Sequence, residues 1–175
     1  MIRKIVDAKD PVLRKKAKPV KKFDKKLLSL IKDLKDTIIA QKDPEGVGLA
    51  APQIGKSLRV FAIKPKDKVR IFVNTKLLSV SKEKTSDEND KKTLEGCLSI
   101  PNFYGPLKRA KKVKIKYQDA KGNEKTEELT GLSARIILHE IDHLNGVLFT
   151  DHILKQKKKL YENIDGEWEE VDLII

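Results

Sequence analysis

The spacing of apolar residues along the chain predicts two amphipathic helices. From Asp24 to about Ala40 the apolar positions recur every three or four residues, which is the helical period, and Asp24 is suited to cap the first turn. A second run with this period begins at Ser133, and Gly146 is expected to end it. The apolar positions are Leu27, Leu30, Ile31, Leu34 and Ile38 in the first helix, and Ala134, Ile137, Leu138, Ile141 and Leu144 in the second.

Shorter segments that are rich in β-branched and aromatic residues, or that alternate apolar with polar residues, predict strands. They are residues 58–63, 69–73, 113–117 and 124–129. The turn at residues 119–123 joins the last two into a hairpin, and residues 162–175 predict a second hairpin with a turn at Asp165 and Gly166. The polar residues 79–92 predict an exposed, mobile loop.

Length and composition favour a single domain with its own core. The chain has 175 residues, and 39% of them are hydrophobic, which suffices for a core without disulfide support. We expect one domain over residues 1–175, with residues 151–175 as a basic C-terminal extension made of a short helix and a hairpin.

The chain is strongly basic, with 38 lysines and arginines against 26 acidic residues and a formal net charge of +12. This charge favours anionic partners such as RNA or the ribosome. Solvated lysines on the surface of a small enzyme are the plainer explanation.

Cys97 is the only cysteine, so an internal disulfide is excluded and a reducing compartment is favoured. The N-terminal residues lack an apolar stretch of signal-peptide length, and about 18 consecutive apolar residues occur nowhere in the chain. We therefore expect a cytoplasmic protein without a membrane partner; the resemblance described below implies that this cytoplasm is of bacterial type.

The chemistry concentrates on the second predicted helix. His139 and His143 are four residues apart, so they share one helical face and can bind one metal ion. Glu140 lies beside them and is suited to move a proton to and from water. A catalytic site normally needs a third protein ligand, and without one the motif is equally compatible with a structural role.

The third ligand has to come from elsewhere in the chain, and three positions bear on this choice. The spacing of metzincin proteases would place a histidine at position 149, which holds Phe149. His152 lies past the expected helix end, so we favour a surface or capping role for it. Cys97, in a tight and partly apolar segment, is the remaining candidate.

Three segments resemble the signature motifs of one family. Residues 46–53, 95–99 and 139–143 are similar, in this order, to the three motifs of peptide deformylase, and the similarity covers about residues 1–150. This family removes the formyl group from N-formylmethionine at the start of nascent bacterial polypeptides and releases formate. The resemblance implies an α+β fold with predominantly antiparallel β-sheets around a central helix that carries the HExxH motif.

The resemblance also implies roles for particular residues, all of which the chain contains. The metal ligands would be Cys97, His139 and His143, with water in the fourth position. Catalysis would use Glu140 as general acid and base, with the Gln53 side chain and the Leu98 backbone N–H as donors to the formyl oxygen. Substrate would be bound by Val47, Gly48, Leu132, Arg135 and Ile136. Glu95 and Arg109 would support the ligand segment.

The resemblance favours Fe(II) as the metal ion, while Zn(II), Ni(II) and Co(II) are compatible with a thiolate and two imidazoles. The expected partners are N-formylmethionyl nascent peptides, with ribosome contact through the basic surface as a further prediction and no specific DNA. Tyr104 and the extra residues 43–45 depart from the family pattern, so preferences beyond methionine do not carry over.

Two rival interpretations stay open at this point. One is a metalloprotease-like hydrolase of another amide substrate, against which Phe149 argues. The other is a non-catalytic, basic, ribosome-binding relict, against which the intact Gln53, Cys97 and Glu140 argue.

Overall fold

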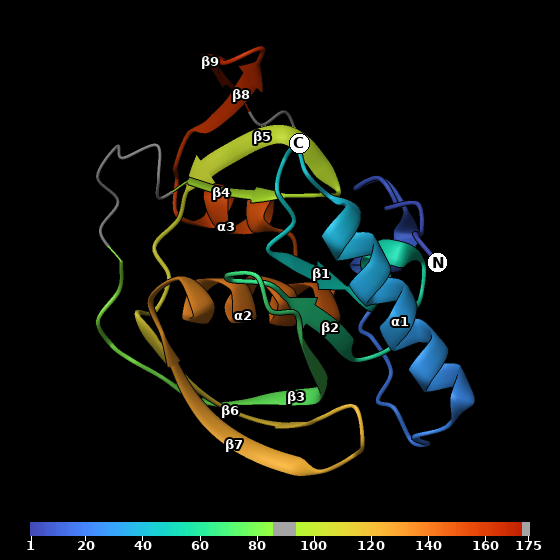
Figure 1. Cartoon of the computed structure of the whole chain (residues 1–175). Coiled ribbons are helices and arrows are strands. Elements are labelled where there is room, and N and C mark those ends of the chain that lie inside the picture. The colour runs from blue at the N-terminus through green and yellow to red at the C-terminus, as the bar shows by residue number, and fades with distance from the viewer. Residues whose placement is uncertain (86–93, 173–175) are drawn as a thin grey trace.

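The computed structural model describes residues 1–85 and 94–172, and its strands form two antiparallel sheets (Figure 1). The first sheet has the order β1-β2-β3-β6-β7, and the second has the order β4-β5-β8-β9. The first contains β1 (Gly48–Ala50), β2 (Val60–Ile63), β3 (Arg70–Val80), β6 (Lys112–Gln118) and β7 (Glu124–Thr130). The second contains β4 (Leu94–Cys97), β5 (Ile100–Pro106), β8 (Leu160–Ile164) and β9 (Glu167–Val171).

The helices in the described residues are α1 (Lys25–Ala40), α2 (Gly131–Leu144) and α3 (Phe149–Lys155), with short 3-10 turns η1 (Pro11–Arg14) and η2 (Ala51–Ile54). The predicted α+β class with mainly antiparallel sheets is therefore confirmed. Within residues 1–85 and 94–172, none of the helices is long and apolar enough to span a membrane.

Helix α1 begins where the sequence predicts. The Asp24 carboxylate accepts hydrogen bonds from the backbone N–H groups of Lys26 at 3.0 Å and Leu27 at 3.1 Å, which satisfies donors that a helix start leaves unpaired. The predicted apolar face is buried, namely Leu27, Leu30, Ile31, Leu34 and Ile38.

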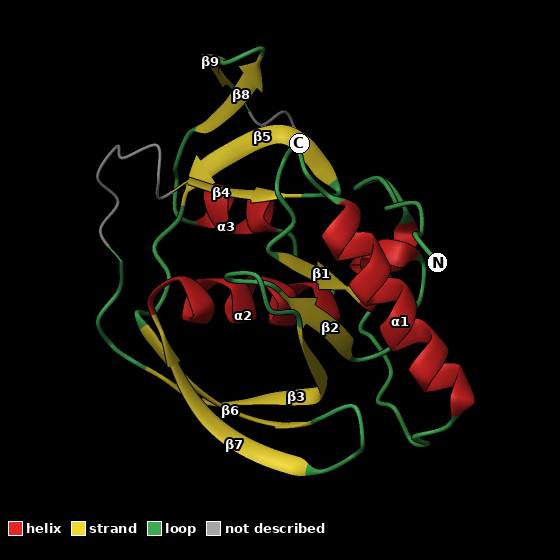
Figure 2. Ribbon diagram, in the orientation of Figure 1, coloured by secondary structure: helices red, strands yellow, loops and turns green. Residues whose placement is uncertain are grey.

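Both faces of strand β2 are buried, because α1 packs on one face and α2 packs on the other. Side chains alternate along a strand, so Val60 and Ala62 pack with the apolar face of α1, while Phe61 and Ile63 pack with that of α2. Figure 2 shows α2 lying above β3, β6 and β7. Packing against the first sheet thus positions α2.

Two predicted boundaries differ from the structure. Strand β3 continues to Val80, well past the expected end at Val73, because it pairs with β6 as far as the Val80 and Val113 partners. The predicted loop therefore starts later than residue 79, and its residues 86–92 lie outside the described residues. The terminal hairpin begins at Leu160 instead of Glu162 and turns at Asp165 and Gly166, as expected, while residues 173–175 are not described.

Strand β4 ends at Cys97 and is held by β5 and α3. Phe149 and Ile153 of α3 are fully buried in the same cluster as Cys97. In β5, Gly105 leaves room for Ile153, since a Cβ at this position would lie against the Ile153 side chain. The second sheet is therefore packed firmly behind the cysteine.

Gly146, which ends the α2 segment, yields a stability prediction. It has a φ of +76°, and a Cβ there would lie 2.6 Å from the Arg14 carbonyl oxygen. We expect Gly146→Ala to lower the free energy of unfolding by about 3 kcal/mol, because left-handed strain and a backbone clash add. Urea denaturation measures this change.

Gly55→Ala is the matched control for this substitution. Gly55 has a φ of +75°, and a Cβ there meets nothing within 4 Å. We expect a loss of only about 1 kcal/mol, from backbone strain alone. Equal losses in the two variants would show that the contact with Arg14 adds nothing.

Candidate active site

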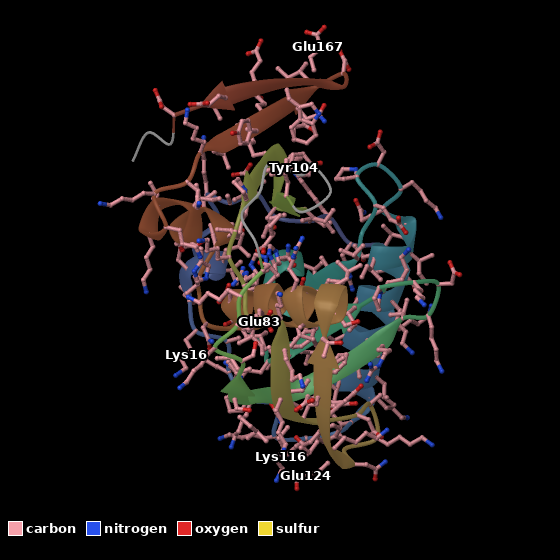
Figure 3. All side chains as sticks on the ribbon, turned by 90° about the vertical axis from the view of Figure 1, so that its left-hand side faces the viewer. Lys16, Glu83, Tyr104, Lys116, Glu124 and Glu167 are labelled. Carbon is pink, nitrogen blue, oxygen red and sulfur yellow. The ribbon has the colours of Figure 1, made fainter. Side chains whose placement is uncertain are left out.

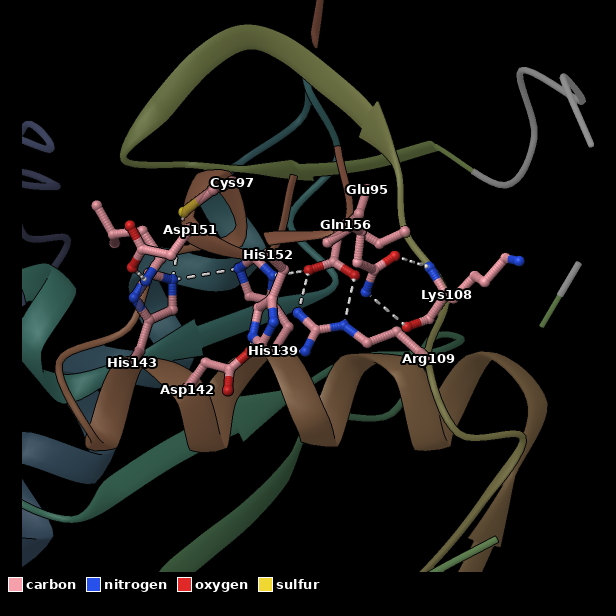
Figure 4. Close-up of polar contacts among 12 residues, drawn as sticks. Glu95, Cys97, Lys108, Arg109, His139, Asp142, His143, Asp151, His152 and Gln156 are labelled. Carbon is pink, nitrogen blue, oxygen red and sulfur yellow. Dashed lines mark hydrogen bonds and ion pairs between the residues drawn. The ribbon is translucent and has the colours of Figure 1, made fainter. Parts of the chain in front are cut away.

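Three side chains with atoms suited to ligate a metal ion converge between α2 and the end of β4. His139 and His143 lie one turn apart on α2, and their Nε2 atoms are 3.2 Å apart. The Cys97 Sγ atom lies 3.2 Å from the His143 Nε2 atom, and all three ligand atoms lie within 4.8 Å of one another. Figure 4 shows the three side chains as sticks. All three are buried.

The hydrogen bonds of the histidines suit a metal ion. His139 Nδ1 lies 2.7 Å from Glu95 Oε1. Since an ionised carboxylate can only accept a hydrogen bond, Nδ1 is the donor, and the Nε2 atom keeps its lone pair for a metal ion. Among the described residues, the buried His143 Nδ1 has no hydrogen-bond partner. One thiolate and two imidazoles form a donor set for a divalent transition metal.

Glu95 belongs to a buried chain of charges behind the ligands (Figure 4). Arg109 donates to both Glu95 oxygens, at 2.6 and 3.0 Å, and to Asp142 Oδ2 at 2.7 Å. Burial alone would raise the pKa of Glu95, but Arg109 and His139 hold that pKa well below its usual range. Glu95 therefore stays ionised and keeps the His139 ring oriented.

His152, for which the sequence predicts a surface or capping role, is instead hydrogen-bonded to Asp142, a residue of this chain. Its Nε2 atom lies 2.9 Å from Asp142 Oδ2, and its side chain is 28% exposed. Nothing in the local sequence indicates this contact, because α2 and α3 are brought together only by the tertiary fold.

Glu140 lies beside the ligands and is almost completely buried. Burial raises the pKa of its carboxyl group to about 8, because the nearby charges offset little of the desolvation. Its Oε1 atom occupies the space that a Cβ on Gly48 would need, and its Oε2 atom has no hydrogen-bond partner in the described chain. Only glycine at position 48 lets β1 approach this carboxylate so closely.

The Gln53 side chain has a fixed orientation. Its Oε1 atom accepts from the Ala50 backbone N–H at 2.8 Å, so its Nε2 group is turned toward Cys97 Sγ and Ser99 Oγ, each at 3.4 Å. Leu98 follows Cys97 in the turn between β4 and β5 and lines the same cleft. Both residues therefore line the cleft beside Cys97.

A cleft of about 240 Å³ opens in front of these groups. The residues proposed for substrate binding all line it: Val47, Gly48, Leu132, Arg135 and Ile136. Leu132 is 53% exposed, so it is not a core residue, whereas Ile136 is buried. His143 and Arg109 do not line the cleft and are buried behind its wall.

The rim of the cleft also contains residues that the sequence analysis did not assign to the site. They are Pro44, Glu45, Asn102 and Tyr104. The only signal was that residues 43–45 and Tyr104 depart from the pattern of the family that the chain resembles.

Comparisons with known proteins agree with this geometry. The family model described as polypeptide deformylase matches residues 2–159. The peptide deformylase of Pseudothermotoga lettingae is 44% identical over 158 residues, which cover 90% of this chain and 86% of that protein. That of Dictyoglomus thermophilum is 39% identical over 162 residues, which cover 93% and 99%. The crystal structure of the Thermotoga maritima peptide deformylase superposes with a TM-score of 0.79 at 40% identity and covers 87% of this chain and 97% of that one.

The buried Arg109 and Glu95 pair yields a prediction about stability. Arg109→Met would leave the Glu95 and Asp142 charges without their cation, so we expect the free energy of unfolding at neutral pH to fall by about 3 to 5 kcal/mol. The loss should shrink as the pH falls, beginning above 4.5, the ordinary pKa of the carboxyl group, because burial without Arg109 raises the pKa of Glu95 in the variant and its protonation removes the unpaired charge. Urea denaturation at several pH values measures both effects.

Arg14→Met provides the control for removal of an exposed arginine. The Arg14 and Asp151 side chains are 49% and 37% exposed, so solvent screens their ion pair. We expect a loss below about 1 kcal/mol. Similar losses in the two variants would contradict a special role for the buried pair.

Proposed function

The chain belongs to the polypeptide deformylase family, and on this premise we propose that α2 is its central catalytic helix and that Cys97, His139 and His143 hold its metal ion. The chain is a metal-dependent hydrolase that removes the N-terminal formyl group of nascent polypeptides. The observation that carries the assignment of the ligands is the convergence of one thiol and two imidazole nitrogens within 4.8 Å.

The reaction is the hydrolysis of an amide. Water adds to the formyl carbon, the bond from this carbon to the methionine nitrogen breaks, and formate and a free amine result. A divalent ion at the three ligands would polarise the formyl oxygen and lower the pKa of a nearby water molecule.

Glu140 would move the protons of this reaction. Its carboxylate accepts a proton from the attacking water and delivers a proton to the leaving amine nitrogen. The group is buried beside the ligands, and its Oε2 atom has no hydrogen-bond partner among the described residues, so this oxygen is available to accept the proton.

Gln53 and Leu98 would stabilise the charge that develops on the formyl oxygen. The Gln53 Nε2 group is held toward the site before substrate binds, so its dipole needs no reorientation during the reaction. The Leu98 backbone N–H would be the second donor. Glu95 and Arg109 support these groups by orienting His139.

The peptide would bind as an added strand. Strand β1 is the edge of the first sheet, so a peptide can pair with the main chain at Val47 and Gly48. The methionine side chain would then enter the apolar pocket formed by Leu132, Ile136 and the aliphatic stem of Arg135. Main-chain pairing suits an enzyme that accepts many different nascent chains.

The metal, the compartment and the domain limits follow from the same proposal. We propose Fe(II) as the metal ion, with Zn(II), Ni(II) and Co(II) as substitutes compatible with the ligands. We place the enzyme in the cytoplasm, where nascent chains are made, and treat residues 1–175 as one catalytic domain. Ribosome contact through the basic surface stays a prediction from charge, which salt-dependent cosedimentation tests.

Of the rival functions, proteolysis by a metzincin-like site finds no support. Phe149, at the position of the missing histidine, is buried in α3, and its ring centroid lies 6.4 Å from that of His139. It contributes packing instead of a ligand.

Glu140→Gln tests the proposed chemistry. We expect formate release from formylmethionyl-leucyl amide, by protein loaded anaerobically with Fe(II), to fall about 10² to 10⁴-fold in kcat. One metal ion per chain should still bind, because Glu140 is not a ligand. Undiminished release in the variant would exclude Glu140 as the general base, and cleavage of unformylated peptides by the parent would favour the protease.

Gly48→Ala tests the placement of the Glu140 carboxylate. A Cβ at this position would lie against Glu140 Oε1 and 2.9 Å from Glu140 Cδ. Since a displacement of about 1 Å can reduce the rate about 100-fold, we expect kcat to fall by this factor. Gly55→Ala, which meets nothing within 4 Å, should keep the kcat of the parent. A fully active Gly48→Ala enzyme would contradict the proposed position of the base.

A further inference from the structure

The C-terminal hairpin reaches the wall of the substrate cleft. Strands β8 and β9 lie beyond residue 159, where the match to the family model ends. They extend the sheet that carries Cys97, because β8 pairs with β5 at Tyr104 and Tyr161. In Figure 3, Tyr104 lies directly below this hairpin, whereas Glu167 is at its far end.

Trp168 of β9 packs against Tyr104. Their ring centroids are 5.3 Å apart with an interplanar angle of 60°, which is an edge-to-face geometry. Both side chains are only half-buried, so the contact with Trp168 covers a part of the Tyr104 ring that no core surrounds.

Tyr104 connects this contact to the reaction centre. Its ring covers Gly96, where a Cβ would lie 2.7 Å from the Tyr104 Cδ1 and Cε1 atoms, and Gly96 precedes the ligand Cys97. Tyr104 also lines the cleft. Burial, and then the charge of Asp43, raise the pKa of the Tyr104 phenol, so the ring stays neutral at physiological pH.

The geometry of an extended peptide identifies what would contact this ring. Successive side chains of an extended chain point in opposite directions. If the methionine side chain enters the pocket on the α2 side, the next side chain points toward the other wall, where β5 supplies Ile100 and Tyr104. An apolar wall favours an apolar second residue.

We propose that Trp168 is a positioning residue that holds the Tyr104 ring as the binding wall for an apolar second residue of the formylated peptide. This inference rests on the proposed function and on the direction in which the peptide is placed there. It gives the terminal hairpin a role in the affinity for substrate beyond the formylmethionine.

Kinetics with two substrates separate this role from a general loss of structure. Formylmethionyl amide ends at the first residue, and formylmethionyl-leucyl amide adds an apolar second one. For Trp168→Ala we expect KM for the longer substrate to rise about five-fold, with kcat within a factor of two and with KM for the shorter substrate unchanged. Trp168→Phe should restore most of the affinity, because it keeps an aromatic ring.

Glu167→Ala, at the end of the same hairpin, is the matched control and should behave as the parent with both substrates. An unchanged ratio of the two KM values in Trp168→Ala would overturn the proposal. A rise of both KM values by the same factor is one such result, because a role beyond methionine cannot affect the shorter substrate. Absence of formate release from both substrates by the parent would instead count against the assigned reaction.

Fluorescence tests the same inference without turnover. Trp168 is the only tryptophan in the chain, so its emission reports on this wall alone. In Glu140→Gln, titration with formylmethionyl-leucyl amide should change the Trp168 emission with saturation, whereas formylmethionyl amide should change it little. A Trp168 emission that does not change with the longer peptide, or that changes equally with both peptides, would overturn the proposal whether or not the parent releases formate.

Discussion

The arrangement of the site depends on the buried carboxylate of Glu95. It lies two residues before Cys97 on β4, so a single strand provides both one proposed metal ligand and the group that orients another, His139. Arg109 stabilises this buried carboxylate because it donates to both Glu95 oxygens. It also donates to Asp142 and so connects the pair to α2. The four-stranded sheet and α2 are therefore joined at the site by ionic hydrogen bonds, which are directional, in addition to apolar packing, which is not. A ligand set drawn from two separate elements requires such a connection to keep its distances.

The helices could be predicted from the sequence because their periodicity reflects the burial seen in the structure. Leu34 and Ile38 on α1, like Ile137 and Leu144 on α2, fall on helical spacing and are fully buried. The extent of β3 could not be predicted in this way. Leu77, Leu78 and Val80 are exposed, and the pairing with β6 shifts register twice, so the strand continues through backbone pairing with a distant segment and not through a local pattern. Tertiary pairing of this kind leaves no signature in the residues themselves.

The residues of the site likewise divide into those that the sequence predicts and those that it does not. The histidines and Glu140 could be found from their spacing on one helix, and Cys97 remained as the candidate third ligand by elimination. Assigning Gln53 required the resemblance to a family, because no local rule links it to residue 139. The contacts of His152 with Asp142 and of Trp168 with Tyr104 were out of reach of both approaches. Each joins residues that are ordinary in their own segments and that acquire a role only when the terminal elements pack onto the catalytic sheet and helix.

The three side chains proposed to hold the metal ion lie beside two acidic residues. Glu95 and Asp142 both accept from one guanidinium, that of Arg109. A cation bound by Cys97, His139 and His143 would add positive charge to this region, where buried anionic groups are costly unless they are compensated. Among the buried carboxyl groups of the described residues, Glu140 is the one with an oxygen that has no hydrogen-bond partner. That group can then gain and lose a proton, which is what the hydrolysis of an amide requires of it.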